Sequence, residues 1–343
     1  MLPLTHTTTP SSSRLSDGHS NLAAAQRGYI YQDAIVAYMM ACRVAEQDGS
    51  LTANWRAHPS DKFDDVAVFD RRGHVRRQAK HSGDTNRAFE AADITTPRQR
   101  ARIDELVCSH RDAGPQQADE YRLCATWRPP TQDEALAWLE PAAIESSFGD
   151  FPTATFRLKA EIIWPEEGEP IWQPLRSVDI TRDDFLAFCA RFVLELECPQ
   201  ISNDFVRPGP LENLLLRILR ERIGVGRYPN RDRSPLDVAA GLLLYAQKVR
   251  TEEATVDVAA IEAHLGLQKD FGRIAQQFPV EAESFVRRDR VQDQLRDLLE
   301  NCVAEGDDQL LLLTGLPGAG KSWLLERIAE ELREAGHLVA RQL

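Results

Sequence analysis

The sequence predicts an α/β protein, and three observations support this fold class. Two short strand-like runs within residues 65–80 lie between segments with helical periodicity. An all-apolar run at residues 310–313 is followed by a glycine-rich loop and a second helical pattern. Between these regions, most of residues 180–267 shows the spacing of helices. The chain therefore predicts an α/β segment, a helical connector and the beginning of a second α/β segment.

The composition is that of an ordinary globular protein. The 343 residues are enough for about two domains, with 43% apolar and 27% charged residues. No stretch approaches the roughly 20 apolar residues of a membrane span, and the N-terminus lacks the apolar core of a signal peptide. The six cysteines are scattered without C-x-x-C pairs, which favours a reducing, cytoplasmic location over a zinc site or a disulfide framework.

The charge is strongly acidic overall but basic in two places. The net charge of −12 argues against a protein that coats nucleic acid non-specifically. Residues 71–81 hold five Arg or Lys and no acid, and residues 211–233 hold six Arg and three acids. A solvated face is the alternative interpretation of both segments.

Residues 309–328, QLLLLTGLPGAGKSWLLERI, carry the most specific motif. They match the phosphate-binding pattern G-x-x-x-x-G-K-[ST] in full. The glycines let backbone N–H groups turn toward phosphate oxygens, Lys321 would reach the β- and γ-phosphates, and Ser322 would offer its hydroxyl to Mg²⁺. ATP and Mg²⁺ are therefore the predicted cofactors, bound by Gly315, Gly318, Ala319, Gly320, Lys321 and Ser322. A glycine-rich turn that binds nothing is the alternative.

Only 21 residues follow Ser322, whereas a complete nucleotide domain needs on the order of 100 or more. We expect residues 283–343 to be the incomplete start of a P-loop NTPase domain, in a longer or shortened chain, without ATP hydrolysis of its own.

The N-terminal part holds a second constellation. Residues 1–20 are rich in Ser and Thr and predict a disordered leader, with a transit peptide as the alternative, and residues 21–46 predict a helix. In the strand-like run 74–80, Gln78 and Lys80 share one face, and Asp65 begins the neighbouring run, 65–69. An acid, an amide and an ammonium that converge in this way suit metal-dependent phosphodiester cleavage. Asp64 competes with Asp65 for the metal.

These residues resemble a known family. The segments GYIYQ (28–32), FDDVAVF (63–69) and RQAKH (77–81) are similar to the PD-(D/E)xK nuclease superfamily, in its Mrr-like, Gln-x-Lys branch found in bacterial antiphage proteins. The resemblance implies a restriction-endonuclease-like fold over residues 21–200. It also implies that Asp65 is the principal metal ligand, that Gln78 replaces the usual glutamate, that Lys80 is catalytic and that Gln32 lies near the site.

The remaining patterns fill in the expected elements. Helix is predicted at residues 96–110, with Pro97 at its first position, and strands at 121–127 and 154–164. From residue 180 the pattern is mostly helical, and residues 201–282 are taken as a helical connector. The helices are expected at 181–197, with Thr181 as its cap, at 211–222, at 234–248, with a capping box from Ser234, and at 259–267.

The segment FVRRD (285–289) resembles the box that opens STAND-type NTPase modules, with Arg287 where that family has Gly. Together the resemblances imply an antiviral STAND-type (Avs-like) defence protein, whose nuclease cuts double-stranded DNA after ATP-driven homo-oligomerisation triggered by phage material. Arg71, Arg72, Arg76 and Arg77 would supply basic charge for DNA, and no membrane is involved. The alternatives are a non-catalytic nucleotide-binding scaffold, in which Asp65, Gln78 and Lys80 do not converge, and a small P-loop kinase.

Overall fold

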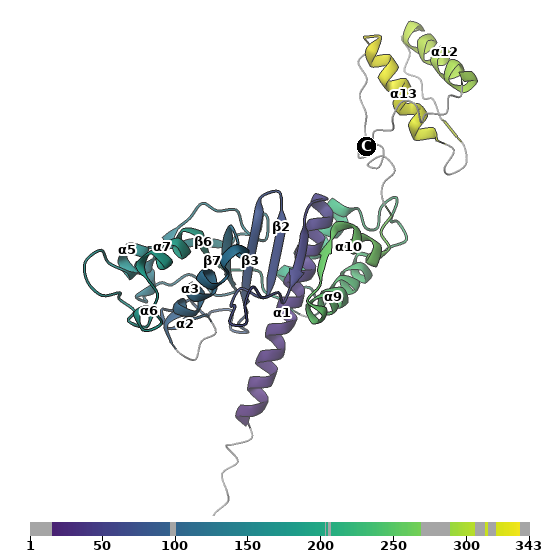
Figure 1. Ribbon diagram of the computed structural model, residues 1–343. Coiled ribbons are helices and arrows are strands. Elements are labelled where there is room, and N and C mark those ends of the chain that lie inside the picture. The colour runs from purple at the N-terminus through teal and green to yellow at the C-terminus, as the bar shows by residue number, and fades with distance from the viewer. Residues whose placement is uncertain are drawn as a thin grey trace, which may run out of the picture. The chain divides into compact units, whose positions relative to one another are not determined.

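The fold is described from a computed structural model (Figure 1). The structure describes residues 16–96, 101–202, 204, 207–268, 289–305, 313–314 and 320–336, without the side chains of 16–24, 289, 302–305, 322 and 326. By its internal contacts the chain divides into two compact units, Met1–Leu267 and Gln268–Leu343.

An eight-stranded sheet organises the first unit and confirms the predicted α/β class. Its strand order is β5-β6-β7-β4-β3-β2-β1-β8. The pairs β3–β4 and β4–β7 are parallel, and all other pairs are antiparallel. The strands are β1 (Ser50–Ala53), β2 (Val66–Asp70), β3 (Gly73–Lys80), β4 (Glu120–Ala125), β5 (Leu139–Pro141), β6 (Ala154–Leu158), β7 (Phe192–Leu196) and β8 (Thr255–Asp257).

Helices cover both faces of this sheet. The first unit contains α1 (Ser16–Glu46), α2 (Ala92–Thr95), α3 (Ile103–Asp112), η1 (Gly114–Gln116), α4 (Ala135–Trp138), α5 (Ala160–Ile163), α6 (Pro174–Ser177), α7 (Arg182–Arg191), α8 (Pro210–Ile218), η2 (Leu219–Ile223, a π-helix), α9 (Pro235–Glu252) and α10 (Val258–Leu265).

Two apolar cores lie on opposite faces, because side chains alternate along each strand. Cys124 packs with α1, α8, α9 and α10 in one core, whereas its neighbours Leu123 and Ala125 pack with α3 and α7 in the other. Figure 1 shows α1 running beside β2, with α9 and α10 next to it. Almost every residue of α1 from Tyr31 to Val44 is buried, and this packing stabilises so long a helix.

The predicted hairpin is present. Strand β2 pairs with β3 in antiparallel register from Val66 opposite Arg77 to Asp70 opposite Gly73. The turn depends on Gly73, whose φ of 119° is open to glycine and strained for other residues. The Asp70 side chain accepts a 2.8 Å hydrogen bond from the backbone N–H of Arg72, which closes the turn.

Several predicted boundaries were wrong. Residues 192–196 form the interior strand β7 and not the end of a helix, since a short, fully buried segment has no polar alternation that would distinguish a strand from a helix. Residues 154–164 divide into β6 and α5, and the helix expected from Thr96 begins at Ile103. Helix α1 starts at Ser16, inside the expected leader, and passes Gly28 without a break. Ser234 caps α9 without a side-chain hydrogen bond, so the predicted capping box is absent there.

Residues after 201 pack closely on the rest of the first unit. Strand β8 pairs with β1, and α8, α9 and α10 all contact α1. The predicted division at residues 20, 200 and 282 stays a prediction.

The described part of the second unit consists mainly of α12 (Asp289–Glu305) and α13 (Lys321–Glu334). Arg296 of α12 and Glu331 of α13 form a 2.8 Å ion pair that joins the two helices. The predicted apolar strand before the glycine loop and the segment after residue 336 lie outside the described residues, apart from residues 313–314.

Candidate functional site

Asp65 lies at the start of β2, where the chain enters the sheet from the segment that follows β1. Its backbone carbonyl accepts a 3.1 Å hydrogen bond from the Asn54 N–H, just past the end of β1. Its side chain is almost fully buried, with a residue exposure of 9%. A carboxylate buried in this way needs hydrogen-bond donors or a cation to replace the lost water.

Three donors meet the Asp65 carboxylate. The Gln32 amide of α1 donates to Oδ1 over 2.8 Å. The Gln78 amide and the Ala79 backbone N–H, both of β3, donate to Oδ2 over 2.7 Å each. The structure thus brings together Gln32, Asp65 and Gln78, which the sequence placed in three separate motifs.

The electrostatics of the site involve Lys80 and Asp64. The pKa of Asp65 is raised to about 7, chiefly by burial; the Lys80 ammonium acts to lower this pKa and the Asp64 charge acts to raise it. Lys80 therefore lies close enough to Asp65 to act on its charge. Since the donors at Asp65 are mostly neutral amides, an added cation would strongly favour its ionised form.

Asp64 faces a different partner from Asp65. Its carboxylate pairs with the Arg56 guanidinium at 2.9 Å, and its side chain is 17% exposed. Of the two neighbouring acids that the sequence left as alternatives, Asp65 is the one that contacts Gln32 and Gln78.

The donor chemistry at Asp65 fits Mg²⁺. This ion prefers oxygen ligands, takes one or two carboxylates and fills its remaining positions with water and substrate phosphate. Half a turn of the Gln78 amide would replace its NH₂ by its carbonyl oxygen at the same position beside Asp65. Within the described ranges there is no group of three or more His, Cys, Asp or Glu placed to hold a metal. Binding there would therefore depend on amide oxygens and on the substrate.

Arg250 is a neighbour of this site that sequence reasoning missed. It projects from α9 and forms a bidentate pair with Asp33 of α1, over 2.7 and 3.2 Å. Its guanidinium also lies 5.3 Å from the ring centre of Tyr29, and the pKa of Arg250 is raised mainly by the hydrogen bond to Asp33, with a smaller contribution from the Asp65 charge. Asp33 and Arg250 are 217 positions apart, and no local pattern in the sequence links them.

The basic residues expected to contact DNA divide into two kinds. Arg76 is fully buried, bonds to Asp61 and lies 4.7 Å from the ring centre of Trp55, and Arg77 is 92% buried. The expectation that these two supply a DNA-facing surface was therefore wrong, because alternate strand residues point into the two cores. The side chains of Arg71 and Arg72 are 84% and 52% exposed, and Arg72 is surrounded by Glu46, Asp70 and Glu145.

The predicted phosphate-binding residues lie only partly within the described residues. Gly315, Gly318 and Ala319 lie outside them, and the Ser322 side chain is not described. Gly320 precedes α13 with a positive φ of 73°, and Lys321 is the first residue of that helix. The positive end of the helix dipole therefore begins at Lys321, as phosphate binding at a helix N-terminus requires.

Comparison with known proteins supports this second region. A family model described as an AAA ATPase domain matches residues 284–342. No curated protein matches the chain. The match gives a nucleotide-binding P-loop NTPase region at the C-terminal end of the sequence, with ATP as its expected ligand. None of the described helices combines the length and the apolar composition needed to cross a lipid bilayer.

Proposed function

We propose that the first unit is a Mg²⁺-dependent endonuclease for double-stranded DNA, controlled by the P-loop NTPase region. The observation that carries this proposal is the convergence on Asp65 of Gln32 from α1 and Gln78 from β3, with Lys80 acting on the same carboxylate. This is the arrangement expected of the Gln-x-Lys branch of the PD-(D/E)xK superfamily, on a sheet with helices on both faces.

The residues divide the chemistry of phosphodiester hydrolysis among them. Asp65 and the carbonyl oxygen of Gln78 would hold Mg²⁺, and Gln32 fixes the orientation of the Asp65 carboxylate. When bound, the ion neutralises phosphate charge and lowers the pKa of water. The Lys80 ammonium orients the attacking water and stabilises the charge that develops as the phosphorus–oxygen bond breaks.

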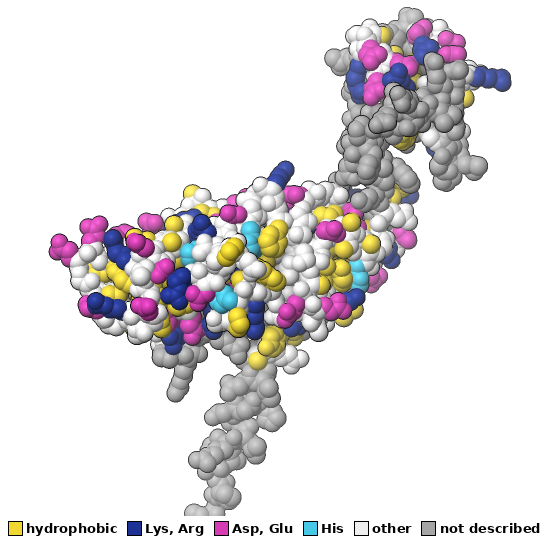
Figure 2. Space-filling model, in the orientation of Figure 1, with side chains coloured by type: hydrophobic (Ala, Val, Ile, Leu, Met, Phe, Trp, Pro, Cys, Tyr) yellow, Lys and Arg dark blue, Asp and Glu magenta, His cyan; other side chains and the backbone are white. Residues whose placement is uncertain are grey.

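The presence of an ATP-binding region in the same chain suggests how the nuclease would be controlled. ATP binding would drive homo-oligomerisation and bring nuclease units together on DNA, in a cytoplasmic antiphage protein of the STAND type that responds to phage material. Figure 2 shows acidic and basic side chains interspersed on the visible face of the molecule. DNA binding by such a surface would depend on local contacts and on clustering of several units, since that face carries no large continuous area of positive charge.

A non-catalytic nucleotide-binding scaffold is the second candidate. It is favoured by the single buried carboxylate at the site, whose oxygens both accept hydrogen bonds from neutral groups. In that case the cluster around Asp65 would only hold α1 against the hairpin.

DNA cleavage separates the two candidates. Plasmid and linear double-stranded DNA would be incubated with the full chain, with and without ATP, in Mg²⁺ and in excess chelator. Asp65→Asn and Lys80→Ala should each reduce cutting by about a hundredfold or more. Lys62→Ala is the matched control, since the Lys62 ammonium is partly exposed and pairs with Glu105 of α3 at 3.0 Å.

Cutting that requires Mg²⁺, Asp65 and Lys80 but not Lys62 would support the nuclease. If folded protein cuts nothing at concentrations that force association, or if Lys80→Ala cuts as well as the wild type, the scaffold replaces it.

A further inference from the structure

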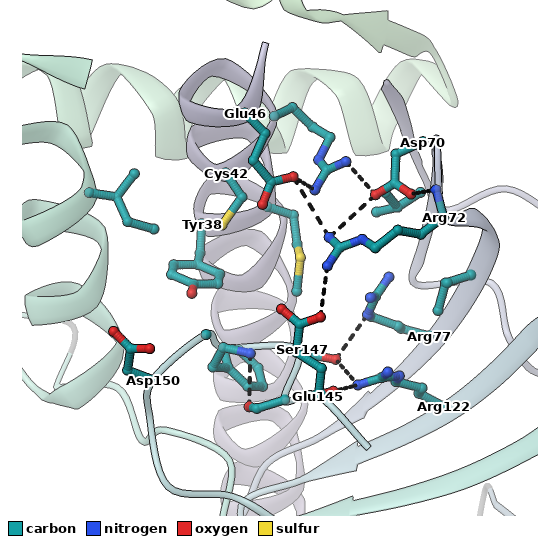
Figure 3. A pocket seen from close by; sticks show the side chains of 18 of the residues that line it. Tyr38, Cys42, Glu46, Asp70, Arg72, Arg77, Arg122, Glu145, Ser147 and Asp150 are labelled. Atoms are coloured by element: carbon teal, nitrogen blue, oxygen red, sulfur yellow. Dashed lines mark hydrogen bonds and ion pairs between the residues drawn. The ribbon is translucent and has the colours of Figure 1, made fainter. Parts of the chain in front are cut away.

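A cavity of about 650 Å³ lies in the first unit, apart from the cluster around Asp65. It is enclosed by the C-terminal half of α1, the β2–β3 hairpin, the loop 145–150 and the α8–η2 segment (Figure 3). Its volume falls within the range of roughly 300–1,000 Å³ that is typical of small-molecule sites. The lining is polar, with six arginines and seven acids, namely Arg43, Arg72, Arg77, Arg122, Arg217, Arg222, Glu46, Asp70, Asp119, Glu120, Glu145, Asp150 and Glu221.

Most of the buried charges in this cavity neutralise one another. Arg43 bonds to Asp70 and Glu46, and Arg72 lies within ion-pair distance of the same two acids and of Glu145. Arg122 pairs with Glu120 at 2.5 Å and with Glu195 at 3.2 Å. These pairs leave little unbalanced charge on their side of the cavity.

Arg77 is the exception. Its residue is 92% buried, and its guanidinium makes one hydrogen bond, from Nε to the Ser147 hydroxyl at 3.2 Å. Its Nη1 has no hydrogen-bond partner, and no carboxylate among the described residues forms an ion pair with it. The acids whose charges act on Arg77, Glu120 and Glu195, are bonded to Arg122 instead. Figure 3 shows Arg77 beside Arg122 at the cavity wall.

A buried guanidinium without a counter-ion is costly, because arginine stays charged and has lost its water. Burial and the neighbouring Arg122 both lower the pKa of Arg77. Such a group persists in a fold most readily where an anion occupies the adjoining space. Phosphate suits it, since the planar guanidinium binds phosphate oxygens with two parallel hydrogen bonds.

The wall beside Arg77 is firmly built. The fully buried Glu195 of β7 accepts hydrogen bonds from the Ser146 hydroxyl, the Ser147 N–H and the Thr153 hydroxyl, over 2.8–3.0 Å. These contacts fix the loop that carries Ser147 and Glu145. The cavity is therefore preorganised for a ligand and does not depend on closure of a loose segment.

We propose that this cavity binds a phosphorylated small molecule of nucleotide size, with its phosphate group on Arg77. A single phosphate would fill only a small part of the volume, so the ligand carries a larger polar body. Arg217 and Arg222, which are exposed and also line the cavity, add attraction for the phosphate, and the Glu145 and Asp150 carboxylates accept hydrogen bonds from hydroxyl or amino groups.

This site is separate from the candidate nuclease site. Arg77 and Gln78 are consecutive in β3, so their side chains point to opposite faces of the sheet. The cavity is lined by α1, the hairpin, the loop 145–150 and the α8–η2 segment, a setting that suits a small molecule better than a DNA duplex. The proposal holds whether or not the protein cuts DNA.

Calorimetric titration of the full chain tests the proposal. The protein would carry Lys321→Ala, which removes the ammonium expected to hold phosphates in the P-loop, and the probes would be AMP, inorganic phosphate and adenosine at constant ionic strength. AMP should bind saturably, phosphate more weakly, and adenosine weakest of all. Arg77→Gln should weaken AMP binding by at least about tenfold, since it removes a charge-assisted contact.

Two further variants make the result specific. Arg157→Gln is the matched control, because Arg157 bonds to backbone carbonyls of residues 190 and 192 outside the cavity and should leave AMP binding unchanged. The exposed pair Arg217→Gln and Arg222→Gln, which should fold normally, is expected to weaken AMP binding by a few fold.

Stability gives a second readout that a purely structural Arg77 would not show. Arg77→Gln removes an uncompensated buried charge, so the ligand-free variant should unfold at the same or a higher temperature than its parent, and AMP should no longer raise that temperature. The proposal is overturned if AMP binding is absent, if adenosine binds as well as AMP, or if Arg77→Gln binds AMP as its parent does. Displacement of AMP from the parent protein by a short DNA duplex would also overturn it, in favour of a DNA contact at Arg77.

Discussion

The buried ion pair between Asp61 and Arg76 gives the sharpest test of what holds the hairpin and the preceding segment together. Both side chains have no exposed surface. The Asp61 carboxylate also accepts hydrogen bonds from the Ser109 hydroxyl at 2.6 Å, the Ala57 N–H at 2.8 Å and the Phe63 N–H at 3.0 Å. It thereby ties the segment that leads to Asp65 onto β3 and α3.

Asp61→Asn would leave the Arg76 charge buried without a partner. Breaking one side of a buried pair costs about 3–5 kcal/mol, and at roughly 2–4 °C per kcal/mol for a unit of this size the unfolding temperature should fall by about 6–20 °C. Asp64→Asn, three residues away, breaks a pair whose Arg56 side chain is 55% exposed, and it should cost less than about 1 kcal/mol.

Urea and thermal unfolding of the two variants measure this difference, and the double variant Asp61→Asn with Arg76→Met should recover part of the loss. The pH dependence has a definite sign. Burial alone would raise the pKa of Asp61, but Arg76 and the Ser109 hydroxyl hold it below its usual value. The stability it contributes is therefore complete above the unfolded pKa of about 4 and is lost as the pH falls below it. Equal costs for Asp61→Asn and Asp64→Asn at neutral pH would refute this account of the segment.

Two further comparisons test the helix caps that the sequence predicted and one contact between helices that it did not predict. Thr181→Ala should lower the free energy of unfolding by about 1 kcal/mol, because Thr181 and Asp184 form a reciprocal capping box at α7. Ser234→Ala should lower it by only a few tenths of a kcal/mol, since Ser234 makes no side-chain cap bond. Urea unfolding compares the two variants, and equal losses would contradict this assignment of the caps. Arg250→Ala should destabilise the first unit by about 1–3 kcal/mol through loss of its bidentate bond to the buried Asp33. Lys248→Ala, exposed on the same helix, should leave unfolding unchanged, and an equally unchanged Arg250→Ala would show that the bond to Asp33 does not stabilise the fold.

The parts of the fold that could be predicted from sequence are those with a local signal. The hairpin at residues 66–80 has turn residues and alternation, and it was placed within one residue. The end of α1 at Glu46 follows the helical periodicity. Strand β7 could not be recognised, because Phe192–Leu196 is buried on both faces and continues directly from a helix. Its strand identity depends on pairing with β4 and β6, which are distant in sequence.

The same contrast applies to the candidate site. Asp65, Gln78 and Lys80 could be grouped because a hairpin places them at one end of two paired strands, and their assigned roles stay predictions. Gln32 was included through resemblance to a family, and the structure adds its contact with Asp65. Arg250 could not be found, since only the packing of α9 on α1 brings it there. The burial of Arg76 and Arg77 was missed because a run of basic residues in a central strand reads like a surface segment.

The segment after residue 201 gives the last prediction, since it was expected to be a separate connector. Buried side chains of α8 and η2 pack against the core beside α1, and they are Leu211, Leu214, Leu215, Leu216, Ile218 and Leu219. At about 1.5–3 kcal/mol each, these six alone would contribute about 9–18 kcal/mol, which is comparable with the whole stability of a typical protein, about 5–15 kcal/mol.

A fragment that ends at residue 200 would also leave the edge of β1 without β8 and break the 2.7 Å contact between the Thr52 and Thr255 hydroxyls. It should aggregate or expose its apolar α1 face, whereas a fragment ending at residue 267 should give a single cooperative unfolding transition. Circular dichroism, size-exclusion chromatography and dye binding to exposed apolar surface would compare the two fragments. A monomeric, cooperatively folded fragment 1–200 would show instead that α8, α9 and α10 form a unit of their own, as the sequence-based division at residue 200 predicts.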